Sequence, residues 1–200
     1  MRGRGSPVMR GGSGAVERVL EGHTDGVRAV CAVRAVCAVR VDGRDLLASA
    51  AADHTVRIWD PGSGAVERVL EGHTDGVRAV CAVRVDGRDL LASAATDHTV
   101  RIWDPGSGAV ERVLEGHTDR VNAVCAVRVE GRDLLASAAH DSTVRLWDPT
   151  MTTGQHITLI PTPAPALAVA QFGTDSLFVG LETGILAVRI HPRERARNLR

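Results

Sequence analysis

Short apolar runs separated by turn-forming residues dominate the middle of the chain. The run at 77–85 (VRAVCAVRV) is β-branched and apolar, and Asp86-Gly87 follows it. An Asp-Gly pair favours the tight turn of a β-hairpin. Three more apolar runs follow, each bounded by Asp, Pro or Gly, at 90–95, 100–103 and 110–114. Runs this short do not carry helical periodicity, so the pattern predicts four strands.

The same arrangement recurs along the chain. Gly-His-Thr-Asp stands at 22–25, 72–75 and 116–119, and Trp-Asp-Pro stands at 59–61, 103–105 and 147–149. The second and third Gly-His pairs are 44 residues apart. The first and second are 50 apart, because AVCAVR at 29–34 is repeated at 35–40. Four short strands in such a period are typical of a β-propeller blade.

The repeated AVCAVR adds one strand length to the first period. Six strand residues span about 20 Å, which a blade strand cannot absorb in register. We expect the surplus to leave the blade as a loop or as an overlong first hairpin. The first blade is therefore expected to be the least regular.

With Gly-His and Trp-Asp each present three times between 15 and 148, the chain resembles WD-repeat proteins, in particular bacterial multi-repeat members. The resemblance implies an all-β propeller of four-stranded antiparallel blades. The segment 150–190 lacks both signatures but keeps strand-like runs at 166–171, 176–179 and 185–190. We therefore expect a propeller over 15–190, with three strong repeats to 149 and one degenerate repeat at 150–190. A disordered segment at 1–14 and a frayed charged tail at 191–200 would flank it.

In WD-repeat proteins, a sequence repeat does not coincide with one blade. The first strand of each repeat forms the outer edge of the preceding blade, and this offset determines the number of blades. The run at 15–20 then has no blade before it, and 155–160 completes the third blade. Pairing 15–20 with the last three strands would close a small ring of four blades. An incomplete propeller, and a ring completed by another copy of the chain, remain open alternatives.

Each repeat carries a His, a Ser, an Asp and a Trp at fixed spacing. The three sets are His23, Ser49, Asp53 and Trp59; His73, Ser93, Asp97 and Trp103; and His117, Ser137, Asp141 and Trp147. Ser, His and Asp are also the residues of a hydrolase triad, but three equivalent copies and the lack of a Gly-x-Ser-x-Gly elbow argue against catalysis. The WD-repeat resemblance implies instead a buried hydrogen-bond network in each blade. We expect no catalytic residue.

Differences between the second and third repeats suggest a binding surface. By the resemblance, three of the six differing positions face the top of the propeller. The candidate partner-binding residues there are Arg28, Arg78, Thr96, Arg120, Asn122 and His140. Arginine suits bidentate contact with carboxylates, so an acidic protein or peptide is the expected partner. The alternative is that a recent duplication drifted at solvent positions.

Composition narrows the function classes. Basic and acidic residues balance at 24 each, and three Trp, two Phe and no Tyr provide no platform for stacking bases. No run has the length of a membrane span, and the four cysteines form no CxxC pair. We expect a cytoplasmic protein with no metal, no cofactor, no nucleic-acid partner and no membrane partner.

The leading hypothesis is a non-catalytic protein–protein interaction scaffold with a rigid top face. The alternative is a sensor or targeting propeller whose effector, a kinase or a nucleotide-binding switch, lies on another or a longer chain. A serine hydrolase is the weakest hypothesis.

Overall fold

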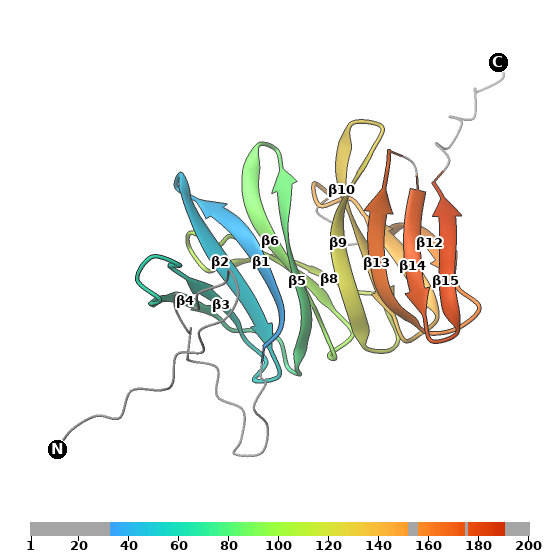
Figure 1. Ribbon diagram of the computed structural model, residues 1–200, viewed down its shortest axis with the longest axis horizontal. Coiled ribbons are helices and arrows are strands. Elements are labelled where there is room, and N and C mark those ends of the chain that lie inside the picture. Colours follow the sequence, from blue (N-terminus) through green and yellow to red (C-terminus); the bar gives the residue numbers. More distant parts are fainter. Residues whose placement is uncertain (1–32, 152–155, 175, 191–200) are drawn as a thin grey trace, which may run out of the picture.

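The computed structural model describes residues 33–151, 156–174 and 176–190, which form four antiparallel sheets and no helix (Figure 1). The first blade contains β1 (Val33–Val41), β2 (Arg44–Ala51), β3 (Val56–Trp59) and β4 (Val66–Leu70). The second contains β5 (Val77–Val85), β6 (Arg88–Ala95), β7 (Val100–Trp103) and β8 (Val110–Leu114). The third contains β9 (Val121–Val129), β10 (Arg132–Ala139), β11 (Thr143–Trp147) and β12 (His156–Pro161). The fourth contains β13 (Ala166–Phe172), β14 (Ser176–Leu181) and β15 (Gly184–Arg189).

These sheets confirm the predicted all-β class with antiparallel blades. Within each complete blade the strands pair in sequence order, so every connection is a simple hairpin. The degenerate repeat forms the three strands expected for it, although the last one begins at Gly184 rather than at 185.

Tight turns set the register of the first hairpin in each complete blade. Asp86 and Gly87 both have positive φ, 50° and 80°, which is the geometry of a type I′ turn. The turn places Val85 opposite Arg88, and the pairing then runs back along both strands. Asp42-Gly43 and Glu130-Gly131 have the same signs of φ at the equivalent places.

This turn also decides which copy of AVCAVR enters the first blade. Pairing starts at Val41 and Arg44 beside the turn, so β1 takes the second copy, at 35–40. β1 and β2 have the lengths and register of β5 and β6. The expected overlong first hairpin is therefore wrong, and the described part of the first blade is as regular as the second. The rest of the surplus lies outside the described residues.

The core lies between neighbouring blades. β1 packs on β5, β5 on β9, and β9 on β13. We call the face of a blade that packs on the following blade its forward face, and the opposite one its rear face. In the second blade, Val83 and Val100 lie on the forward face against the third blade. Val80 and Leu91 lie on the rear face against the first blade.

The four blades form an open arc. In Figure 1 the first blade, in blue, and the fourth, in red, stand at opposite ends of the array. Within the described ranges, the fourth sheet does not pack on the first, and it has three strands. The described residues therefore do not form a closed ring of four blades. After three junctions between blades, the fourth sheet does not yet contact the first. The strand expected at 15–20 lies outside the described residues.

Candidate functional site

A chain of hydrogen bonds crosses the second blade from its Trp to its Asp. Trp103 Nε1 donates to Ser93 Oγ at 2.8 Å. Ser93 Oγ lies 2.8 Å from His73 Nε2, and His73 Nδ1 lies 2.7 Å from Asp97 Oδ2. Asp97 lies in the β6–β7 turn and His73 in the loop before β5. The hydrogen-bond network therefore joins three parts of the blade.

The direction of these bonds follows from the available protons. The Asp97 carboxylate only accepts, so His73 Nδ1 carries the proton of that bond. In this tautomer of a neutral His73, Nε2 accepts the proton of Ser93, whose oxygen accepts the indole N–H. Every group in the chain is satisfied by the next.

The third blade contains the same chain. Trp147 Nε1 donates to Ser137 Oγ at 2.8 Å, His117 Nε2 lies 2.7 Å from that oxygen, and His117 Nδ1 lies 2.8 Å from Asp141 Oδ2. In the first blade Trp59 Nε1 donates to Ser49 Oγ at 2.7 Å. The fourth member there, His23, lies outside the described residues.

The network shifts the pKa of its acids and of its histidine in the third blade. Burial alone would raise the pKa of Asp97, but the interactions with His73, Thr99 and the Thr74 backbone together outweigh it and lower that pKa far below its ordinary value. Burial lowers the pKa of His117, and the neighbouring Asp141 offsets this only in part. The network therefore favours an ionised aspartate and a neutral His117.

Gly72, the glycine of the second Gly-His pair, leaves space for this arrangement. Gly72 has a φ of +151°, and a Cβ there would lie 3.0 Å from Arg101 Nη1 and 3.3 Å from the Trp103 ring. A side chain at this position would strain the backbone and press on the indole. The motif needs glycine for both reasons.

The serines are inaccessible to a substrate in this conformation. Ser93 and Ser137 are 0 % exposed, and Ser49 is also buried. A hydrolase nucleophile must reach a carbonyl carbon, and these hydroxyl oxygens are covered while bonded to an indole. The geometry supports a structural role for the His–Ser–Asp sets.

The candidate top-face residues that the structure describes, Arg78, Thr96, Arg120, Asn122 and His140, lie at the end of the blades opposite the Asp-Gly turns. Two backbone hydrogen bonds of 3.0 Å hold this end, from Thr96 N to Gly76 O and from His140 N to Arg120 O. Each joins the loop before the first strand of a blade to the turn after its second strand. The half-buried side chains of Arg78 and Arg120 are therefore presented from a fixed backbone.

Three guanidinium groups from successive blades gather there. Arg34 and Arg78 hold equivalent positions on β1 and β5, which pack on each other, and Arg120 directly precedes β9, which packs on β5. Burial lowers the pKa of Arg78, and the positive charges of Arg34 and Arg120 lower it further. None of the three forms an ion pair within the described ranges, whereas Arg44 and Arg88 at the opposite end each bind two carboxylates. These three guanidinium groups therefore have no carboxylate partner among the described residues, although Asp75 and Asp119 lie in the loops of the same end.

The structure corrects one candidate and restricts another. Arg34, not Arg28, occupies the first-blade position equivalent to Arg78, because β1 uses the second AVCAVR copy. Arg28 itself lies outside the described residues. Asn122 is buried, and its amide donates to Ala166 O at 2.8 Å, so it ties the third blade to the fourth instead of facing solvent.

Unsatisfied polar atoms also occur at this end. Arg78 Nε, Asn122 Oδ1 and His140 Nδ1 are buried and have no hydrogen-bond partner within the described part of the chain. Unpaired buried polar atoms are costly unless another group satisfies them. Thr96 and His140 are half-buried, so a bound segment could reach them.

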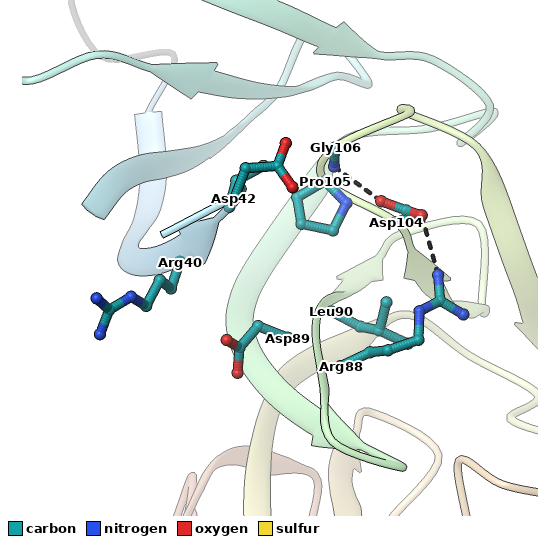
Figure 2. A pocket seen from close by; sticks show the side chains of 9 residues that line it. Arg40, Asp42, Arg88, Asp89, Leu90, Asp104, Pro105 and Gly106 are labelled. Carbon is teal, nitrogen blue, oxygen red and sulfur yellow. Dashed lines mark hydrogen bonds and ion pairs between the residues drawn. The ribbon is translucent and has the colours of Figure 1, made fainter. Parts of the chain in front are cut away.

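A shallow pocket lies at the opposite end, between the first two blades (Figure 2). It measures about 250 Å³, and Arg40, Asp42, Arg88 and Asp104 are among its lining residues. Figure 2 shows Arg88 reaching Asp104, a contact of 2.9 Å, and Arg88 also binds Glu111 at 2.8 Å. Because these charges already neutralise one another, the pocket is a weaker candidate than the arginines at the other end.

The described part of the chain lacks two features. It contains no group of three or more His, Cys, Asp or Glu side chains arranged to hold a metal ion. None of its segments forms a helix with the length and apolar character of a membrane span.

Antiparallel sheets packed side by side, two of them crossed by a hydrogen-bond network from Trp to Asp, define a propeller-type repeat protein. The family model described as "WD domain, G-beta repeat" matches residues 14–60, 64–104 and 108–148. The chain belongs to this family, which confirms the resemblance to WD-repeat proteins, while the likeness to bacterial members stays a prediction. The comparison with curated proteins finds no match. Members of the family generally mediate protein–protein interactions and are typically non-catalytic.

Proposed function

We propose that this protein is a non-catalytic interaction scaffold that binds an acidic protein segment on its top face. We define the top face by Arg34, Arg78, Thr96, Arg120 and His140. The observation that carries the proposal is the gathering of three arginines from three blades without a carboxylate partner among the described residues.

Charge and geometry both favour a carboxylate-bearing partner. Like charges held close together repel one another, and an incoming anion relieves that repulsion. Arginine can bind a carboxylate through two parallel hydrogen bonds, and partial burial of Arg78 strengthens such bonds. His140 Nδ1 offers a further unsatisfied polar atom beside them.

The rigid backbone of this face supports tight binding. The bonds from Thr96 N to Gly76 O and from His140 N to Arg120 O already order the turns that present the side chains. Binding then costs little additional ordering of the protein. Self-association through the ends of the arc is a separate proposal, because it uses other faces of the molecule.

A direct binding titration tests the proposal. The probe is a fluorescein-labelled octaglutamate peptide, followed by anisotropy at low and moderate salt. We expect Arg78→Ala and Arg120→Ala each to weaken binding about fivefold to tenfold, which corresponds to about 1 kcal/mol per lost contact. Affinity should also fall as salt screens the charges.

Arg84→Ala is the matched control. Arg84 is an exposed arginine on the same strand as Arg78, at the opposite end of β5. It removes the same charge without touching the top face. Equal losses for Arg84→Ala and Arg78→Ala, or no loss for Arg78→Ala and Arg120→Ala, would refute the assignment of the site.

A further inference from the structure

The forward face of the fourth blade is apolar and uncovered. Phe172, Phe178 and Ile185 are 68 %, 40 % and 79 % exposed. By strand register these positions correspond to Val83, Ala92 and Val100 of the second blade. Those three are at most 3 % exposed, because the third blade covers them. The fourth blade thus has an interblade surface with no blade on it.

At the other end of the arc, the rear face of the first blade is exposed at Val36, although Trp59, equivalent to rear-face Trp103, is buried. Val36 is 58 % exposed, whereas Val80 and Val124, at the same position in the next two blades, are each 7 % exposed. Val80 is buried by packing against the first blade, and Val124 by packing against the second. One end of the arc therefore offers a forward face and the other end a rear face.

We propose that two copies of this chain join head to tail, with the forward face of each fourth blade packed on the rear face of the other copy's first blade. The argument is continuity with the junctions inside the chain, since forward meets rear at all three of them. Each new junction repeats that arrangement and buries the exposed aromatic and aliphatic side chains.

Ring size limits the number of copies. A head-to-tail contact produces a closed ring only if its rotation returns to the start. Propellers typically have 4 to 8 blades. Four blades do not close here, so two copies, with eight blades, complete the ring. The assembly would leave no free blade face.

The fourth blade also ends in an unpaired strand. Within the described ranges, β3, β7 and β11 each pair with an outer strand, whereas β15 has none. The fourth blade therefore offers a free strand edge beside its exposed forward face.

Light scattering during size exclusion tests the proposal on the full chain. The wild-type protein should elute at twice the 21.2 kDa mass of one chain. Ile185→Glu changes the forward face and Val36→Glu the rear face. Each should raise the dissociation constant of the dimer at least about a hundredfold, because a carboxylate would enter a dry junction. Both positions are exposed within one chain, so unchanged tryptophan fluorescence will show that each variant is folded.

Leu159→Glu is the control. Leu159 lies on the outer strand β12 and is 43 % exposed, close to the value for Phe178, but it belongs to neither free face. This variant should remain dimeric. A monomeric wild type, a species that grows with concentration beyond two chains, or a dimer that resists either Ile185→Glu or Val36→Glu overturns the proposal. Top-face binding uses different residues, so either proposal can fail while the other stands.

Discussion

Replacing Ser137 with Ala removes a single oxygen on which two buried groups depend. In the third blade this oxygen accepts the indole N–H of Trp147 at 2.8 Å and contacts His117 Nε2 at 2.7 Å. Ser137 is 0 % exposed, so the cavity left behind has no open path to solvent. The substitution therefore leaves a donor and an acceptor unsatisfied in the core.

The expected loss follows from those two groups. Each unsatisfied buried polar group costs about 1–3 kcal/mol, so the two groups left by Ser137→Ala should reduce the free energy of unfolding by about 2–6 kcal/mol. This is a large share of the roughly 5–15 kcal/mol typical of a domain. Urea denaturation followed by tryptophan fluorescence measures the change.

Two comparisons make this test specific. Ser93→Ala removes the equivalent oxygen from the second blade and should cost a similar amount. Ser107→Ala alters an exposed turn serine, whose bond to Ala109 N water can replace, and should cost less than about 0.5 kcal/mol. If Ser137→Ala unfolds within about 0.5 kcal/mol of the parent, the network does not hold the blade together.

Three further predictions concern pH, backbone and thiols. Because the folded-state pKa of His117 lies below 6.5 and that of Asp97 below 3.8, the unfolded chain binds these protons first. Stability should thus fall below about pH 6.5 and again below about pH 3.8, and urea midpoints that rise on acidification would contradict this. Gly72→Ala should cost about 1–3 kcal/mol through its positive φ, and an unchanged melting temperature would disprove it. Burial raises the pKa of Cys37 and Cys125 to about 11. Both thiols should therefore be alkylated at pH 8 about a hundredfold more slowly than free cysteine, as measured by peptide mapping. Equal rates would contradict their burial.

Much of the fold could be predicted because its determinants are local. The Asp86-Gly87 turn and the apolar runs beside it identify β5 and β6, and the Trp-Asp-Pro turn ends β7. The spacing of His73, Ser93 and Asp97 is periodic, and the structure brings these side chains together because each lies at an equivalent place in a regular hairpin.

The expectations for Arg28, Asn122 and a closed ring differ from the structure. They depend on features that the local sequence pattern does not determine. The two AVCAVR copies are identical, and a shift by six residues leaves the same side chains on the same face of the strand. Only the strand register counted back from Asp42-Gly43 shows that Arg34 lies at the position equivalent to Arg78. Asn122 is polar, yet its amide binds a backbone carbonyl 44 positions further along the chain, a contact that depends on blade packing. The open arc likewise depends on the angle between blades, which no single repeat encodes.

Hydrogen exchange of the indole protons, observed by NMR, tests most directly the claim that equivalent blades are each held by an indole-centred polar chain. The protein has three tryptophans, and their Nε1–H groups donate to Ser49, Ser93 and Ser137 at 2.7–2.8 Å. We predict three slowly exchanging indole protons, of which Ser137→Ala makes one exchange rapidly. Indole protons that exchange at the rate of a free peptide, or a Ser137→Ala variant that leaves all three equally protected, would contradict the claim.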